Sequence, residues 1–360
     1  MYVIDNIKNT IIKGDSIEEL KKIPNDSIDL IFADPPYYMQ TEGELLRTNG
    51  SKFNGVDDEW DKFDSFEDYD NFSANWLKEC RRILKITGSI WVIGSFQNIF
   101  RIGKIMQDLG FWILNDIIWS KTNPVPNFKG TRFCNAHETL IWCGKNKNTK
   151  YTFNYKTMKH LNNDKQDKSV WNISLCTGNE RLKDKYGNKV HSTQKPEELL
   201  FKIILSSSKP YDIVLDPFFG TGTAGAIAKK LSRNYIGIER EDKYIYYAKE
   251  RIKNTEIEMT NLINLDYEVK PPKVSIKALI KKGYLKPNQK LYTKKGDEIC
   301  QLKENGNVEN ELGNFSIHQM SAKLQNLSKY NGWNYFYTYY NDAFMPIDEL
   351  RYIYAGDNNE

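Results

Sequence analysis

Cysteine is scarce in this chain of 360 residues: there are five, and no two of them form a Cys-x-x-Cys pair. An odd, scattered set argues against a disulfide framework or a cysteine-based zinc site and is typical of free thiols in a reducing compartment. No run approaches the roughly 18 apolar residues that a membrane-spanning helix needs. The first residues include Asp5 and no apolar stretch of the signal-peptide kind. These absences predict a cytoplasmic protein without a structural metal.

A strong excess of one charge is also lacking. The chain has 51 Lys and Arg against 47 Asp and Glu, a net charge of +4, with 27% charged and 40% hydrophobic residues. This balance permits nucleic-acid binding without arguing for it, because a local basic patch matters more than the total. The length suits one large α/β domain with a small appendage.

What the sequence does contain is a stiff polar turn after a buried strand. Residues 27–33 alternate and then run apolar, which predicts a strand, and Asp34-Pro35-Pro36-Tyr37 ends it because proline cannot donate to a sheet. Ligands bind at the carboxyl ends of strands in open α/β sheets. A carboxylate, a proline carbonyl and an aromatic ring would hold the exocyclic amino group of a flat base, with two acceptors for its N–H groups and a ring for its face.

A second strand, 211–216, ends in the turn Pro217–Thr223, which opens a helix. Gly220 and Gly222 permit a tight turn and close approach of a ligand. The following strand ends at Glu239, where an acid can hold both ribose hydroxyls of a nucleoside. Dehydrogenases that use nicotinamide cofactors share this geometry, so they remain an alternative. The turn nevertheless lacks their three-glycine fingerprint and would cradle a pyrophosphate poorly.

Strands and helices alternate along the first 260 residues, which predicts a doubly wound, mostly parallel α/β sheet. The clearest elements are strand 10–13, helix 66–84, strand 89–93, strand 111–119, helix 197–207, strand 234–238 and helix 244–252. Ser16 and Glu19 have the spacing of a capping box for the first helix. His137 and Glu138, with no third partner, are interpreted as structural.

Three polar intervals interrupt this alternation. Residues 38–64 leave directly from the Asp34 turn and suggest a mobile flap over DNA, with a solvated insertion as the alternative. Residues 123–128 hold two prolines and form a stiff loop of asparagines, and residues 145–190 are polar with interleaved aromatics that suit either DNA recognition or dimer packing. The candidate DNA contacts are Arg47, Lys52, Asn123, Asn127, Lys129, Arg132 and Arg181.

In this order the motifs resemble those of DNA adenine-N6 methyltransferases of the β class, and within it the subgroup of the HinfI and CcrM-type enzymes. The resemblance rests on Asp34–Tyr37, Asn123–Phe128, Asn135–Trp142, His191–Pro196 and Asp216–Thr223, and residues 274–333 resemble the tail of that subgroup. It covers nearly the whole chain. The four-residue Asp34 motif alone is moderately specific, whereas the ordered set is highly specific.

The resemblance implies a circularly permuted methyltransferase fold that moves a methyl group from S-adenosylmethionine to N6 of a flipped-out adenine in duplex DNA, within 5′-GANTC-3′. It also implies a homodimer and, as one possibility, a separate restriction endonuclease partner. Asp34, Pro35, Pro36 and Tyr37 would be catalytic. The cofactor residues would be Asp15, Thr193, Gln194, Lys195, Asp216, Phe218, Gly220, Thr221, Gly222, Thr223 and Glu239.

Within that set, Asp216 would take the ammonium of the cofactor, Glu239 its ribose and Lys195 its carboxylate, with Asp15 near its adenine. The expected domain spans residues 1–260, with a catalytic half (1–144), a target-recognition insertion (121–190) and a cofactor half (191–260). A linker (261–273) and a C-terminal module (274–360) would follow.

The C-terminal module has a basic start and an aromatic segment. Eight lysines and no acids lie between residues 273 and 295, and residues 333–340 are densely aromatic and strand-like. Both features suit DNA, and a solvated lysine face beside a small β core is the alternative. For the whole chain, methylation of cytosine N4 or of RNA, and a non-catalytic DNA-binding protein with a decayed methyltransferase fold, remain the other readings.

Overall fold

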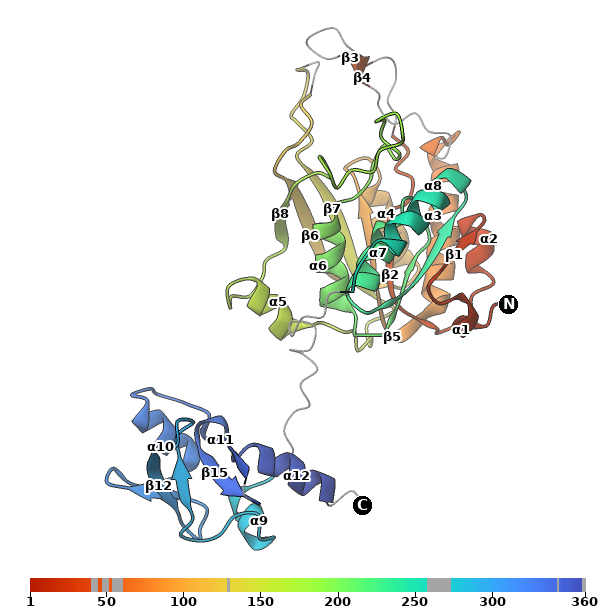
Figure 1. Cartoon of the computed structure of the whole chain (residues 1–360). Helices are drawn as coiled ribbons and strands as arrows, with labels where there is room; N and C mark the ends of the chain where they lie inside the picture. The colour runs from red at the N-terminus through yellow and green to blue at the C-terminus, as the bar shows by residue number, and fades with distance from the viewer. Residues whose placement is uncertain are drawn as a thin grey trace. The chain divides into compact units, whose positions relative to one another are not determined.

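The structure is a computed structural model that describes residues 1–39, 45–46, 52–53, 61–127, 130–257, 273–341 and 343–357. The chain divides into two compact units, Met1–Tyr267 and Glu268–Glu360 (Figure 1). Each unit has its own hydrophobic core. Among the described residues, no helix is both long and apolar enough to cross a membrane.

The first unit is built on an eight-stranded sheet with the order β1-β10-β9-β2-β5-β7-β6-β8. All its neighbours pair in parallel except β5 with β7 and β7 with β6, so the predicted doubly wound, mostly parallel sheet is confirmed. The strands are β1 (Thr10–Lys13), β2 (Ile28–Ala33), β5 (Leu84–Gly94), β6 (Trp112–Lys121), β7 (His137–Gly144), β8 (Val170–Ile173), β9 (Ile213–Asp216) and β10 (Asn234–Glu239). Two short strands, β3 (Leu45–Leu46) and β4 (Lys52–Phe53), pair apart from this sheet.

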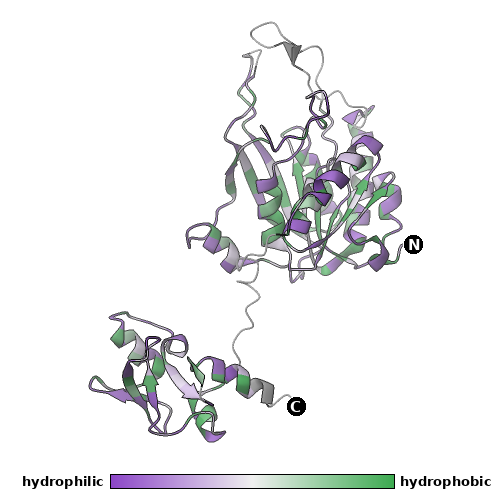
Figure 2. Ribbon diagram, in the orientation of Figure 1, coloured by the Kyte–Doolittle hydropathy of each residue, from purple (hydrophilic) through white to green (hydrophobic). Residues whose placement is uncertain are grey.

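Helices cover both faces of the sheet. Successive strand residues point to opposite sides, and the apolar residues on each side are buried under helices. Ile31 and Ala33 of β2 pack into the core under the helices of the N-terminal half, whereas Leu30 and Phe32 pack into the core under α6 and α7. The layers are visible in Figure 1, and the apolar residues gather on the central strands in Figure 2. The helices are α1 (Ile4–Ile7), α2 (Ser16–Leu20), α3 (Phe66–Ile83), α4 (Ile99–Asp108), α5 (Tyr155–Leu161), α6 (Glu197–Ser207), α7 (Thr223–Lys230) and α8 (Asp242–Lys253).

Four neighbouring strands end together at the carboxyl edge of the sheet. In register, Lys13 of β1 lies beside Glu239 of β10, and Gly237 of β10 lies beside Asp216 of β9. The neighbouring strand β2 runs in the same direction and leads directly into Asp34. The chain order reverses between β9 and β2, and such a switch point opens a crevice for ligands. The sheet topology therefore brings the two predicted halves of the site together.

The second unit is a six-stranded antiparallel sheet with the order β14-β13-β12-β11-β15-β16. Residues 333–340 do not form one strand, contrary to the sequence-based expectation: Trp333 lies in the short helix α11, which Asn331 caps, and only the second half is a strand. Trp333 is buried, with Arg351 stacked 4.5 Å from its ring centroid. The elements are α9 (Ile276–Lys281), β11 (Lys290–Tyr292), β12 (Glu298–Leu302), β13 (Val308–Asn310), β14 (Gly313–Phe315), α10 (Ile317–Leu324), α11 (Gly332–Tyr335), β15 (Tyr337–Tyr340), β16 (Ala343–Pro346) and α12 (Glu349–Asp357).

Candidate active site

One pocket at the carboxyl edge of the first sheet gathers the predicted catalytic and cofactor residues. All of them except Gly222 line it: Asp15, Asp34, Pro35, Pro36, Tyr37, Thr193, Gln194, Lys195, Asp216, Phe218, Gly220, Thr221, Thr223 and Glu239. The lining also includes Asp61, His191 and Tyr244, which sequence reasoning did not identify.

The Asp61 carboxylate holds the backbone that follows the two prolines. It accepts hydrogen bonds from the backbone N–H groups of Tyr37 (2.6 Å), Tyr38 (2.8 Å) and Met39 (2.8 Å). Tyr38 has a left-handed backbone with φ of 52°, a conformation that a non-glycine residue keeps only where its surroundings enforce it. Asp61 is 7% exposed and lies at the far end of the polar interval interpreted as a flap. That interval therefore returns to the catalytic turn at Asp61.

A second clamp holds the same turn from the α3 side. The Tyr69 hydroxyl donates to the Pro36 carbonyl oxygen at 2.9 Å and receives the side-chain amide of Asn98, also at 2.9 Å. The Asn98 oxygen in turn accepts the Ser95 backbone N–H. Carbonyl and N–H groups of the turn are thus fixed by buried side chains, which is the preorganisation that a reacting group needs.

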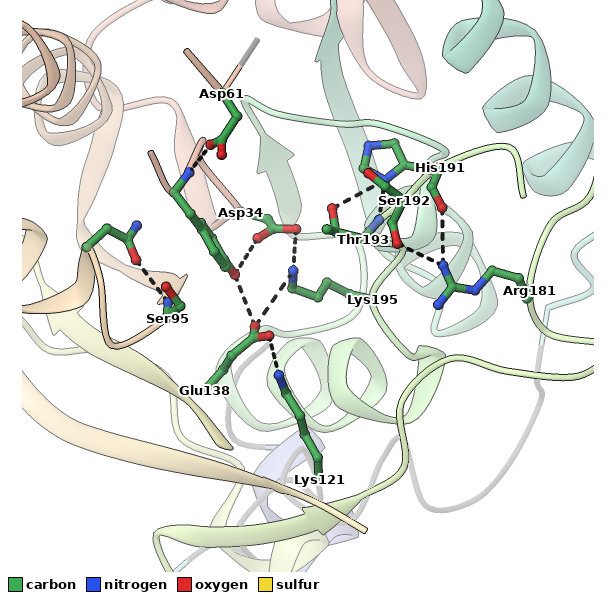
Figure 3. Close-up of polar contacts among 12 residues, drawn as sticks. Asp34, Asp61, Ser95, Lys121, Glu138, Arg181, His191, Ser192, Thr193 and Lys195 are labelled. Carbon is green, nitrogen blue, oxygen red and sulfur yellow. Dashed lines mark hydrogen bonds and ion pairs between the residues drawn. The ribbon is translucent and has the colours of Figure 1, made fainter. Parts of the chain in front are cut away.

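Asp34 lies in a buried network of two carboxylates and two lysines (Figure 3). The Lys195 ammonium is 2.9 Å from Asp34 Oδ2 and 3.8 Å from Glu138 Oε2, while Glu138 Oε1 accepts the Lys121 ammonium at 2.7 Å. The Tyr37 hydroxyl bridges the two acids, at 2.9 Å from Asp34 Oδ1 and 3.1 Å from Glu138 Oε2. The network has two negative and two positive charges, so it balances.

The environment shifts the two acids in opposite directions. Burial raises the pKa of Asp34 above its ordinary value, although Lys195 opposes the shift. Burial also acts on Glu138, but Lys195 and Lys121 outweigh it and lower the pKa of that carboxyl. For Lys195, burial opposes the charge, yet Asp34 and Glu138 outweigh burial and raise its pKa. Glu138 therefore stays ionised to lower pH than Asp34 does, and Lys195 stays protonated.

Two residues of this network make contacts that the sequence did not predict. Lys195 was expected at the carboxylate of the cofactor, but in the structure its ammonium pairs with Asp34 and Glu138 because the 191–196 segment delivers it to the acids. His137 and Glu138 were interpreted as structural, but the Glu138 carboxylate belongs to the polar network of the site. Strand β7 runs antiparallel to β5, so its first residues meet the carboxyl end of β5, and the Glu138 carboxylate enters the site. The order of the strands in space, which periodicity does not reveal, places it there.

Two glycines shape the turn that the sequence suggested for the cofactor. Gly222 has φ of 73°, and a Cβ there would lie 2.8 Å from the Ala248 side chain. Phe219 lies flat against Gly237, where an added Cβ would come within 2.4 Å of its ring. Phe218 faces the opposite core and packs edge-on against Trp76 with ring centroids 5.2 Å apart. The turn is therefore rigid and closely packed where a ligand would approach it.

Acids form the other side of the pocket. Asp216 is buried and accepts the Phe218 backbone N–H, and burial raises its pKa well above the ordinary value. Glu239 accepts the Gly220 backbone N–H at 2.7 Å, and burial raises its pKa also. Asp15 accepts the backbone N–H groups of Ile17 and Glu18, so Asp15, and not Ser16, is the N-cap of α2. Three acids that are buried or half-buried, Asp216, Glu239 and Asp34, suit a positively charged ligand.

The segment before α6 is fixed by its own side chains. The Gln194 amide accepts the Leu182 backbone N–H and donates to the Glu180 carbonyl oxygen, and the Thr193 backbone N–H donates to the His191 ring. Arg181 was expected to contact DNA. Its guanidinium instead turns inward and donates to three carbonyl groups, of Cys176, His191 and Ser192, which tie residues 176–192 to the pocket wall.

The remaining DNA candidates lie outside the pocket. Asn123 and Arg132 are exposed, Asn127 is half-buried, and all three lie in the loop between β6 and β7. Asn123 accepts the Leu175 backbone N–H, and Arg132 stacks 5.5 Å from the Phe96 ring centroid. Three further candidates cannot be placed: Arg47 and Lys129 lie outside the described residues, and only the backbone of Lys52, in β4, is described.

The sequence of residues 28–250 matches the family described as DNA methylase. The chain belongs to this family. It is 64% identical over 353 residues to the type II methyltransferase M.HinfI of Haemophilus influenzae, covering 98% of each chain. It is 43% identical over 244 residues to the type II methyltransferase M2.LlaDCHI of Lactococcus lactis subsp. cremoris, covering 67% of this chain and 88% of the relative.

Solved structures agree with the fold. The complex of M1.HpyAVI with SAM superposes with a TM-score of 0.50 at 29% identity, covering 68% of this chain and 98% of the other. The PvuII DNA methyltransferase, which is cytosine-N4-specific, gives a TM-score of 0.54 at 20% identity and covers 72% and 92% of the two chains. The second likeness concerns the fold alone. Together they place the pocket in a methyltransferase architecture.

The pocket suits S-adenosylmethionine better than a nicotinamide dinucleotide. S-adenosylmethionine carries a sulfonium and an ammonium, and the acids Asp216 and Glu239 in the pocket lining match that charge. The negative charges of a pyrophosphate would be repelled by those acids. Lys195 is engaged with Asp34 and Glu138. The glycine turn, with its helix beginning at Thr223, gives the close approach that an adenosyl group needs.

Proposed function

We propose that this DNA methylase transfers a methyl group from S-adenosylmethionine to N6 of adenine in duplex DNA. The observation that carries the proposal is the Asp34 carboxylate, held at the carboxyl edge of β2 beside the Tyr37 ring and facing the acid-lined turn. The resemblance of the sequence associates aspartate at this position with adenine and serine with cytosine N4. Methylation of cytosine N4 is therefore the alternative.

S-adenosylmethionine supplies an electrophilic methyl group on its sulfonium sulfur. Asp216 would hold the ammonium and Glu239 the ribose hydroxyls, while Phe218, Thr221 and Thr223 line the same wall. Because Lys195 pairs with Asp34, the proposal no longer assigns it to the cofactor carboxylate. The turn at Gly220 and Gly222 brings the backbone to the bound group.

The chain's task toward adenine is to make N6 nucleophilic. Its lone pair is delocalised into the ring, and two acceptors on its N–H groups localise that pair and aim it. Asp34 and the Pro35 carbonyl are the proposed acceptors, and Tyr37 stacks on the base. Fixed dipoles that match charge as it forms, and two reactants held in line, supply most of the rate. Asp34, whose pKa burial raises, is placed to take the departing proton.

An adenine inside a duplex cannot reach Asp34 in the pocket, so the base has to be flipped out. We infer the sequence 5′-GANTC-3′ from the resemblance to the HinfI and CcrM-type subgroup, and the 64% identity to M.HinfI along 98% of both chains supports the subgroup. That resemblance alone also suggests a homodimer and, as one possibility, a separately acting restriction endonuclease, whereas the proposed location in the cytoplasm rests on the absences in the sequence. The exposed loop between β6 and β7 is the proposed DNA-contacting surface, through Asn123, Asn127 and Arg132.

The test is methyl transfer to matched duplexes that contain or lack GANTC. Radiolabelled methyl incorporation, resistance to a nuclease that cuts GANTC, and identification of the methylated nucleoside are measured together. We expect N6-methyladenine in the GANTC duplex only. N6-methyladenine in another sequence would keep the chemistry and reject the subgroup, and N4-methylcytosine would establish the alternative. Absence of transfer to any DNA, with the cofactor bound, would reject the proposal.

Asp34→Asn tests the assigned role of the carboxylate. We expect a loss of at least roughly 10²–10³-fold in single-turnover rate, because the amide presents one acceptor and no charge, while the dissociation constant for S-adenosylmethionine stays within about threefold. Asp29→Asn is the matched control. Asp29 lies on the same strand, pairs with Lys85 at 2.7 Å and sits away from the pocket. Loss of cofactor binding in Asp34→Asn would show that the two halves of the site are wrongly assigned.

A further inference from the structure

Lys195 occupies the position that the proposed function gives to the amino group of the base. Its ammonium donates to Asp34 Oδ2 at 2.9 Å and lies 5.1 Å from the centroid of the Tyr37 ring. These are the two features, one acceptor and one ring face, that would capture adenine N6. The ammonium and the amino group of the base cannot occupy the same place between Asp34 Oδ2 and the Tyr37 ring, and Asp34 Oδ1 already accepts the Tyr37 hydroxyl.

A base that docks on Asp34 must therefore displace the ammonium, and the ammonium then needs a closer contact with its other acid, Glu138. Lys195 is 8% exposed, and a buried cation without a partner is strongly unfavourable. Glu138 Oε2 lies 3.8 Å from Lys195 Nζ, just beyond hydrogen-bond distance and within reach of a small side-chain rotation. The Lys121 bond at Oε1 leaves capacity at Oε2 for a second donor besides the Tyr37 hydroxyl.

We propose that Glu138 is a positioning residue that receives the Lys195 ammonium when the target base takes its place on Asp34. The exchange keeps two negative and two positive side chains in the network throughout, so no charged side chain is left without a partner when the base enters. Glu138 acts through Lys195 and does not touch the base. This inference rests on the proposed function, because it assumes that an amino group docks on Asp34.

The firm anchoring of Glu138 suits this role. Its carboxylate is set by strand β7, which is paired on both sides, and by Lys121 at 2.7 Å. Asp34 in contrast is at the end of a strand, in the turn that meets the ligand. Of the two acids, Glu138 is therefore the fixed acceptor and Asp34 the one that exchanges partners.

The test isolates the contact with the amino group. Affinity is measured, with S-adenosylhomocysteine present, for two duplexes of the sequence that the wild-type protein methylates: one with adenine at the target position and one with purine, which lacks the amino group. The ratio of the two dissociation constants is the amino preference. Glu138→Gln should lower this preference roughly tenfold or more, because Lys195 then stays on Asp34.

The decisive comparison is the same substitution in a Lys195→Met background. With the competing ammonium removed, Glu138→Gln should leave the amino preference within about twofold, so the two substitutions are strongly non-additive. An equal loss in both backgrounds would overturn the inference, since Glu138 would then act through Tyr37 or Lys121. No loss in the wild-type background would overturn it as well.

Glu19→Gln is the matched control, since Glu19 also accepts a tyrosine hydroxyl (Tyr2, 2.6 Å) and a lysine (Lys22, 2.8 Å) but does not line the pocket. It should keep the amino preference. Thermal unfolding of each variant shows whether it is folded. If the wild-type protein methylates no adenine, the proposed function has failed. If it methylates adenine and the double substitution is additive, only the role of Glu138 has failed.

Discussion

Asp34 has to be ionised to take the proton that leaves N6, and its neighbours decide at which pH it is ionised. Burial raises its pKa, Lys195 opposes that shift, and Glu138 adds to it. Lys195→Met removes the opposing charge, so the pKa of Asp34 rises further and less of it is ionised at a given pH. The acid limb of kcat/KM should therefore move to higher pH, and activity lost near neutrality should return as the pH rises.

The pH profile of kcat/KM for DNA, measured at a saturating concentration of the cofactor, checks this expectation. Lys85→Met removes the lysine that pairs with Asp29, the carboxylate within β2, and should leave the profile unchanged. An acid limb of Lys195→Met at or below the wild-type position would show that Lys195 does not set the ionisation of Asp34.

Asp61 offers a second prediction at this scale, because three backbone N–H groups depend on one carboxylate. Asp61→Ala leaves them without that acceptor. We expect the free energy of unfolding to fall by about 2–3 kcal/mol, and kcat to fall roughly 10- to 100-fold because the Tyr37 turn shifts. Denaturant titration and single-turnover kinetics measure the two effects.

Asp212→Ala is the comparison for Asp61→Ala. Asp212 also accepts a backbone N–H, that of Lys209 at 2.7 Å, but it precedes β9 and so lies at the opposite edge of the sheet from the pocket. It should lower stability while leaving kcat nearly unchanged. If Asp61→Ala likewise changes only stability, Asp61 holds the fold and not the catalytic turn.

At the scale of elements, patterns that repeat locally were predictable. Strand 10–13 and helix 197–207 begin and end where the sequence suggested, and in the helix apolar residues about four apart bury one face. The two motifs after β2 and β9 were also predictable, since glycine and proline mark turns at strand ends. The pairing of strands in space could not be predicted from these local patterns. That β7 runs antiparallel to β5 is a tertiary fact, and it is what brings Glu138 to Asp34.

Competing local preferences explain the other differences. Asp15 and Ser16 can both cap a helix, and only the backbone at Asp15, extended with ψ of 133°, shows which one does. Aromatic residues favour strands, yet Trp333 lies in a helix whose N-cap is Asn331 because a buried site for its ring outweighs the propensity. Arg181 was predicted to contact DNA because of its charge, but its guanidinium donates to the backbone carbonyl groups of Cys176 and His191.

At the scale of the whole molecule, charge is distributed unevenly along the second unit, whose lysines gather near its start. All eight lysines between residues 273 and 295 are exposed, and the described part of this stretch contains no acid. Lys290 pairs with Glu298 from the neighbouring strand, so that lysine is partly neutralised. Lys281, Lys282 and Lys286 take part in none of the ion pairs found among the described residues, and we propose that they contact DNA phosphates.

Substitution of Lys281, Lys282 and Lys286 by glutamine tests this proposal in the full-length protein. Each phosphate contact that is lost should reduce the slope of log K against log salt by about 0.9, and affinity at low salt should fall for all duplexes alike. The methylated sequence should not change, because phosphate contacts position a protein without reading bases. Arginine at the same three positions keeps the charge and should keep the slope. An unchanged slope in the glutamine variant would leave these lysines as a solvated face, and the second unit would then need another role.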